Sequence, residues 1–122
     1  MPRARVVFYK EEDGMVPLLE WFGGLTRKAV VKCRIRIERL RELGYELRRP
    51  EADSLRDEIY ELRVSLQGIN YRMLYFFHED HAAVVSHGIT KERVVPPKEI
   101  NLAVARKRKF NQSPKRHMYE EG

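Results

Sequence analysis

The chain has 122 residues, enough for one domain with a single hydrophobic core, and hydrophobic residues make up 43% of it. No apolar run approaches the roughly 20 residues that a membrane span needs, and the polar N-terminus does not resemble a signal peptide, so we expect a cytoplasmic protein. The one cysteine, Cys33, excludes an internal disulfide and a cysteine-based metal site, and the formal net charge of +6 disfavours a basic partner.

The first half of the chain predicts one strand followed by two helices. Residues 5–9 (RVVFY) form a short apolar strand that needs a neighbour in a sheet. Residues 16–22 predict a short helix with proline in its first turn, ended by two glycines. Thr26 is the expected N-cap of the next helix, and Gly44 the residue that terminates it. Its buried stripe consists of Val30, Cys33, Ile37, Leu40 and Leu43.

Residues 59–91 predict three consecutive strands after a polar linker at residues 45–56. Apolar and polar residues alternate over residues 60–66, and aromatic residues dominate residues 71–77. A third apolar stretch covers residues 82–88. The intervening turns are short, which allows only antiparallel neighbours and therefore predicts a meander.

A last helix is predicted for residues 98–110, opened by two prolines, with Ile100, Ala103, Val104 and Phe110 facing inward. Residues 111–122 lack periodicity, and we expect them to form a flexible basic tail. Residues 1–110 would then be a single domain.

Basic residues gather in two segments of the chain. Residues 27–49 hold nine of them against three acidic residues, and residues 91–116 hold nine against two. This distribution favours a polyanionic partner such as nucleic acid, although a protein with an acidic surface would fit the same charge.

Four segments resemble a known family. They are VPLLEWFGGL at residues 16–25, YELRV at 60–64, YRMLYFF at 71–77 and HGITKERVVPPKEINLA at 87–103. In this order they look like the phage-derived Gp49-like, HigB-type branch of the RelE/ParE toxin superfamily, over about residues 4–110. The resemblance implies a RelE-like fold and a type II toxin–antitoxin toxin. Such a toxin cleaves messenger RNA on the ribosome and is silenced by a DNA-binding helix-turn-helix antitoxin.

The resemblance also implies roles for particular residues. Arg63 matches a basic residue on the second strand of the family sheet, and Arg72 an arginine on the third. Lys91 matches a basic residue after the last strand, and Lys98 a lysine that opens the final helix. The chain departs from the family where Ile89 replaces an aromatic residue and Glu92 a second lysine, and no tyrosine stands near the start of the last helix.

RNA cleavage by transesterification needs a stabiliser for the charge that develops on the phosphate, and a guanidinium suits this task. Arg72 is the first candidate because it interrupts an apolar strand, and Arg63 is the second. His87 is a candidate general acid or base beside the loop that carries Lys91. Further RNA-binding candidates are Arg93, Lys98, Arg106, Lys107, Arg108 and Lys109. The histidine spacing resembles no metal site, so we expect no metal or other cofactor.

The sequence therefore predicts an α+β domain with a RelE-like order: an N-terminal strand, a two-helix hairpin, a three-stranded antiparallel meander and a C-terminal helix. We expect the hairpin on one face of a mostly antiparallel sheet and an open, basic, concave face opposite. The predicted function is a ribosome-dependent endoribonuclease toxin, with the ribosome, messenger RNA and an antitoxin as partners. Two alternatives stay open: a ParE-like inhibitor of DNA gyrase, and a non-catalytic nucleic-acid-binding module of the same fold.

Overall fold

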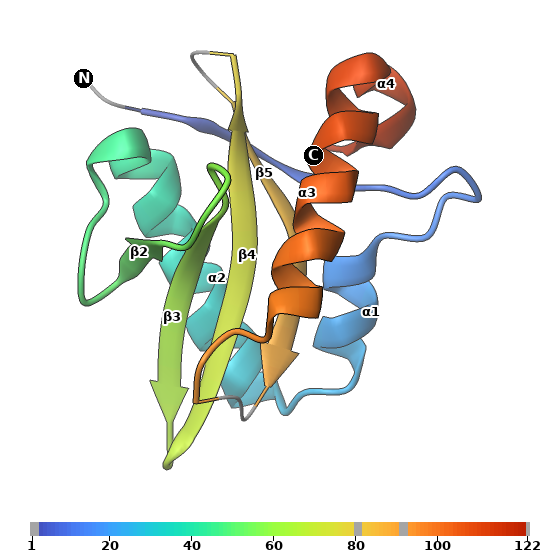
Figure 1. Cartoon of the computed structure of the whole chain (residues 1–122). Helices are drawn as coiled ribbons and strands as arrows, with labels where there is room; N and C mark the ends of the chain where they lie inside the picture. Colours follow the sequence, from blue (N-terminus) through green and yellow to red (C-terminus); the bar gives the residue numbers. More distant parts are fainter. Residues whose placement is uncertain (1–2, 80–81, 91–92, 122) are drawn as a thin grey trace.

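The protein has a mixed α+β fold in which helices cover both faces of one six-stranded sheet (Figure 1). The computed structural model describes residues 3–79, 82–90 and 93–121. The elements are β1 (Arg5–Tyr9), α1 (Pro17–Gly23), α2 (Arg27–Leu43), a 3-10 helix (Gly44–Glu46), β2 (Ala52–Ser54), β3 (Tyr60–Leu66), β4 (Ile69–His78), β5 (Ala82–Thr90), α3 (Pro97–Gln112), α4 (Pro114–His117) and β6 (Met118–Tyr119). The order of strands across the sheet is β2-β3-β4-β5-β1-β6.

The predicted antiparallel meander is confirmed as β3, β4 and β5. Gln67 and Gly68 form the two-residue turn between β3 and β4, with φ angles of 53° and 79°. Positive φ at both central residues is typical of the hairpin turns that match the twist of the strands. β1 pairs in parallel with β5, so the N-terminal strand lies inside the sheet, as a fully apolar strand requires.

The predicted helical hairpin covers one face of the sheet. The hydroxyl of Thr26 accepts a hydrogen bond from the Ala29 backbone N–H, which confirms the N-cap of α2. Buried side chains of both helices pack against the sheet: Leu18 and Phe22 from α1, and Cys33, Ile37 and Leu40 from α2. Burial raises the pKa of the Cys33 thiol to about 11, consistent with a role in packing. No helix in the described part of the chain is both long and apolar enough to cross a membrane.

The opposite face is less open than the sequence predicts, because α3 packs across it (Figure 1). Ile100, Ala103 and Phe110 of α3 bury Leu74 and Phe76 of β4 in a second core. β3 and β2 lie to the side of this helix (Figure 1). The expectation of an open concave face is therefore wrong over β4 and β5.

Two further expectations are corrected. The polar linker contains β2, which pairs with the start of β3 through Ala52 and Leu62. The flexible tail is also wrong for the described residues, since α3 continues to Gln112 and α4 and β6 follow it. β6 pairs antiparallel with β1, and the carboxylate of Glu120 accepts two hydrogen bonds of 2.7 Å from Arg5.

Candidate functional site

Arg63 and Arg72 lie directly opposite each other on β3 and β4. The two-residue turn fixes this register, since it pairs Leu66 with Ile69 and then every residue outward from there. The neighbours of the two arginines along β3 and β4 face the helical hairpin: Leu62, Val64, Tyr71 and Met73. Because successive side chains of a strand point to opposite faces of the sheet, both arginines lie on the other face. The prediction that the two arginines share one face of the sheet is confirmed.

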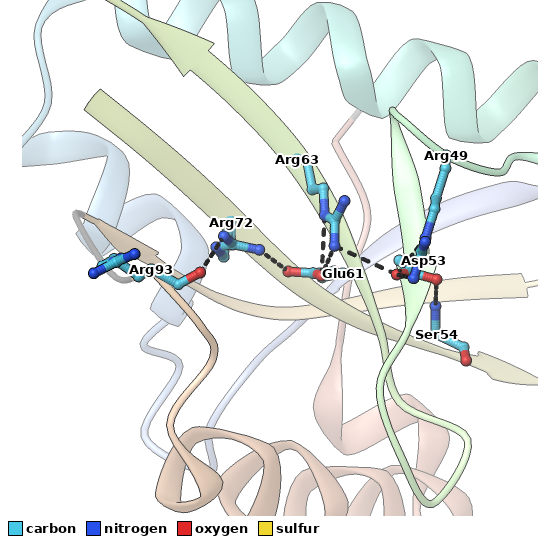
Figure 2. A network of polar contacts seen from close by, with 7 residues as sticks. All are labelled: Arg49, Asp53, Ser54, Glu61, Arg63, Arg72 and Arg93. Carbon is cyan, nitrogen blue, oxygen red and sulfur yellow. Dashed lines mark hydrogen bonds and ion pairs between the residues drawn. The ribbon is translucent and has the colours of Figure 1, made fainter. Parts of the chain in front are cut away.

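A buried carboxylate joins the two guanidinium groups (Figure 2). One oxygen of Glu61 accepts a hydrogen bond of 2.7 Å from Nη1 of Arg72, and the other accepts one of 3.1 Å from Nε of Arg63. The Glu61 side chain is 3% exposed, against 13% for Arg72 and 37% for Arg63. A carboxylate this well buried is stable only when it is paired, so Glu61 holds both guanidinium groups in fixed positions.

The contacts continue on both sides of this trio. Arg72 also donates to the backbone oxygen of Arg93 at 2.8 Å, which ties β4 to the segment before α3. Arg63 lies 3.3 Å from a carboxylate oxygen of Asp53 in β2, and Arg49 donates to the same oxygen at 2.8 Å. Partial burial acts to raise the pKa of Asp53, but the hydrogen bonds from Arg49 and Ser54 outweigh it and lower the pKa. We call Arg49, Asp53, Glu61, Arg63 and Arg72 the edge network.

The edge network borders a cavity of about 440 Å³. Arg63 and Arg72 line it from the sheet, and Arg36 lines it from α2. Three guanidinium groups around one cavity suit a phosphate or another anion. Sequence reasoning missed Arg36, although a signal existed: Lys32, Arg36 and Arg39 recur at spacings of four and three, which places them on one face of α2.

His87 does not reach this cavity. Its ring is buried under α3, where Nδ1 lies 2.7 Å from the Ser86 hydroxyl and Nε2 lies 2.9 Å from a carboxylate oxygen of Glu99. A carboxylate only accepts, so Nε2 of the neutral ring carries the proton and Nδ1 accepts from Ser86. Burial, assisted by the charge of Arg106, lowers the pKa of His87 despite the hydrogen bond to Glu99. Both ring nitrogens are engaged inside the protein, away from the arginines.

Arg106 completes this buried arrangement, which corrects its prediction as an exposed RNA-binding residue. Its side chain is 10% exposed and donates to Glu11 at 3.0 Å and to Ser86 at 3.4 Å. Its guanidinium carbon also lies 5.3 Å from the centre of the Tyr9 ring. We call Arg106, Ser86, His87 and Glu99 the buried chain, since each donates to the next.

The other predicted site residues are spread along the surface. Lys91 and the departure at Glu92 lie outside the described residues. Lys107 is paired with Glu58 at 2.5 Å, and its side chain is 18% exposed. Arg93, Lys98, Arg108 and Lys109 are exposed and remain RNA-binding candidates. Among the residues described, no group of three or more His, Cys, Asp or Glu side chains is placed to hold a metal ion.

Comparison with known proteins identifies the family. No curated protein matches this chain. A family model for phage-derived Gp49-like proteins matches residues 20–108, a span that includes the end of α1, α2, the meander, most of α3, the edge network and the buried chain. The match confirms the resemblance to Gp49-like proteins drawn from the sequence motifs. Because it covers well over half of the chain, the protein belongs to the phage-derived Gp49-like family.

Proposed function

We propose that this protein is the toxin of a type II toxin–antitoxin system and that it cleaves messenger RNA on the ribosome. The observation that carries the proposal is the pairing of Arg63 with Arg72 on one face of the sheet, beside a cavity large enough for a nucleotide. Membership in the Gp49-like family is compatible with a toxin. The element order, with a helical hairpin before an antiparallel meander, supports a RelE-like fold.

In this proposal Arg72 stabilises the transition state of transesterification. The 2′-hydroxyl attacks the adjacent phosphate, the 5′-oxygen leaves, and negative charge grows on the phosphate oxygens. A guanidinium that is already fixed can stabilise this charge without reorganisation, and Glu61 fixes Arg72 with a 2.7 Å hydrogen bond. Arg63 binds the neighbouring oxygens of the same phosphate. A helix-turn-helix antitoxin would keep the toxin inactive by covering this face.

The proposal is tested by single-turnover cleavage of messenger RNA on programmed ribosomes, measured alongside ribosome binding. For Arg72→Ala we expect the cleavage rate to fall by about 10²–10³, with a much smaller loss of ribosome affinity, because other cations still hold the RNA. Arg72→Lys should cleave faster than Arg72→Ala but more slowly than the wild type, since lysine keeps the charge but lacks the planar guanidinium that binds two phosphate oxygens at once. Arg116→Ala is the matched control, as it removes an equal charge from an exposed position on α4 that is not among the RNA-binding candidates.

Arg72 is largely buried, so each variant must first be shown to be folded by thermal melting. A folded Arg72→Ala protein that cleaves at the wild-type rate would remove Arg72 from the mechanism. Complete absence of cleavage by the wild type would reject the nuclease.

A non-catalytic nucleic-acid-binding module is the second candidate. It is favoured by the fact that the described acidic partners already engage both arginines: Glu61 contacts both, and Asp53 contacts Arg63. In that case RNA binding would persist in a wild-type protein that does not cleave. The ribosome assay and a binding assay together separate the two candidates.

A further inference from the structure

The cavity beside the edge network lies where the sheet has a free edge. β2 pairs with β3 from Tyr60 to Leu62, and the Arg63 backbone N–H donates to the Glu51 backbone oxygen at 2.8 Å; among the described strands none pairs with the rest of β3 on this side. α2 runs past this edge, and Lys32 donates to the backbone oxygen of Ser65 at 3.1 Å. The cavity is therefore bounded by the end of β3 on one side and by the basic face of α2 on the other.

Arg36 is the cation of this cavity whose hydrogen-bonding capacity is least used. Among the described residues its guanidinium makes no hydrogen bond, and its buried Nε has no partner. The nearest carboxylate is Glu51, at 3.8 Å from Nη1. This distance is too long for a hydrogen bond.

The carboxylate of Glu51 already accepts hydrogen bonds from another arginine. Nε of Arg39 donates to one of its oxygens at 2.9 Å, and Nη2 donates to the other at 3.1 Å. The hydrogen bonds from Arg39 lower the pKa of Glu51, so this carboxylate stays ionised and bound to Arg39 at neutral pH. Arg36 thus shares Glu51 with Arg39 through a long ion pair only, and its side chain is three-quarters buried, with an exposure of 25%.

A partly desolvated guanidinium with unused donors has a high affinity for an oxyanion, because the anion replaces the hydrogen bonds that water no longer supplies. Ser65 and Asn70 line the same cavity and add polar groups, and Tyr71 adds an aromatic ring. This combination of a planar cation, short polar side chains and a ring suits the phosphate of a nucleotide better than an isolated carboxylate.

We propose that Arg36 is the main residue of a phosphate-binding subsite, and that it receives the RNA phosphate next to the one held at Arg72. The RNA strand then passes from the face that carries Arg63 and Arg72, around the free edge of β3, to the basic face of α2. The inference rests on the proposed function, since it extends the RNA path of that site.

The test uses the isolated protein and a single-stranded RNA tetranucleotide with 2′-O-methyl sugars, which binds but cannot undergo transesterification. Fluorescence anisotropy of the labelled tetranucleotide gives the affinity at several salt concentrations. For Arg36→Gln we expect affinity to fall about tenfold or more, as for loss of a charged hydrogen bond. The slope of log affinity against log salt should become shallower by about 0.7, the value for one phosphate contact on a single strand.

Arg27→Gln is the matched control, because Arg27 is exposed at the start of the same helix, on the side away from Arg36, and the substitution removes the same charge. It should change affinity less than twofold. Arg36→Lys keeps the charge and should bind with intermediate affinity, which guards against a folding defect in the glutamine variant. A tetraglutamate peptide should not compete with the RNA.

Four results would overturn the subsite: no binding of the tetranucleotide by the wild type, wild-type affinity in Arg36→Gln, an equal loss in Arg27→Gln, or full competition by the peptide. A protein that needs Arg36 for the tetranucleotide but does not cleave on ribosomes would retain the subsite and reject the nuclease. Failure of the two proposals is thus distinguishable.

Discussion

The edge network and the buried chain lie on the same face of the sheet and use the same chemistry, arginine joined to glutamate. They differ in what covers them. α3 lies over the buried chain, and Arg106 of α3 turns inward, where it donates to Ser86 and Glu11; the edge network instead borders a cavity at the free edge of the sheet. Both regions contain arginines, so burial by neighbouring elements, and not residue type, determines which arginines can bind an external anion.

The largest effect expected from this comparison is on stability, at Arg106. Arg106→Ala removes a nearly buried ion pair, a hydrogen bond to Ser86 and the contact with Tyr9, so the free energy of unfolding should fall by about 3 kcal/mol. Arg108→Ala, two residues further along α3 and exposed, should change it by less than about 0.5 kcal/mol. Urea denaturation measures both. A stable Arg106→Ala protein with weakened RNA binding would reverse the assignment of Arg106 to the interior.

Glu61 provides the next test, with opposite effects on stability and binding. Glu61→Gln keeps the shape but removes the charge that holds Arg63 and Arg72, and it should cost about 1–2 kcal/mol of unfolding free energy. The released guanidinium groups should bind the 2′-O-methyl tetranucleotide more tightly.

The control for Glu61 is Glu46→Gln, since Glu46 is an exposed glutamate of the 3-10 helix, away from the arginine pair. It should change neither the free energy of unfolding nor the affinity. Weaker RNA binding by Glu61→Gln would mean that the carboxylate is needed to aim the arginines and does not compete for them.

The smallest effect is the pH dependence of the buried chain. The pKa of His87 is lowered in the folded protein, so below its ordinary value of about 6.5 the unfolded chain binds more protons than the folded one. Stability should then fall as the pH drops below about 6.5, by at most about 1.4 kcal/mol per pH unit, until the folded pKa is reached.

His87→Gln lacks this titration, so the difference in unfolding free energy between wild type and variant should narrow from pH 7.5 to 5.5. Urea denaturation at three pH values in this range is sufficient. Parallel curves for the two proteins would show that His87 titrates normally when folded.

Local patterns in the sequence were sufficient for most of the fold. The alternation in residues 60–66, the N-cap at Thr26 and the proline pair before α3 each depend on neighbours within a few residues, and the structure has the corresponding elements there. β2 and β6 were missed because they have only three and two residues. Strands this short are too short to show an alternation of apolar and polar residues. They form only because they pair with strands distant in the sequence, β2 with β3 and β6 with β1.

The candidate site was predictable where register alone decides it. Arg63 and Arg72 follow from the short turn, but the burial of Glu61 between them depends on tertiary packing, including the pairing of β2 with β3. Arg106 carried a signal that its basic neighbours hid: it lies three residues after Ala103 and four before Phe110, on the buried stripe of α3. The helical spacing of Lys32, Arg36 and Arg39 indicates a basic face, but not that Arg39 forms the hydrogen bonds to Glu51 while Arg36 lies 3.8 Å from it, since this depends on tertiary geometry.

The contact between α1 and β5 has a practical consequence for optical experiments. Trp21, the chain's one tryptophan, packs so closely on Gly88 that a Cβ there would lie 2.2 Å from its ring. Its indole N–H donates to the Thr90 hydroxyl at 2.9 Å, and its ring contacts the Tyr71 ring edge-on, with 6.2 Å between the ring centres. Tyr71 in turn lines the cavity of Arg36. The intrinsic fluorescence of the unlabelled protein therefore originates one aromatic contact away from the proposed phosphate subsite, and its emission offers a reporter that needs no dye.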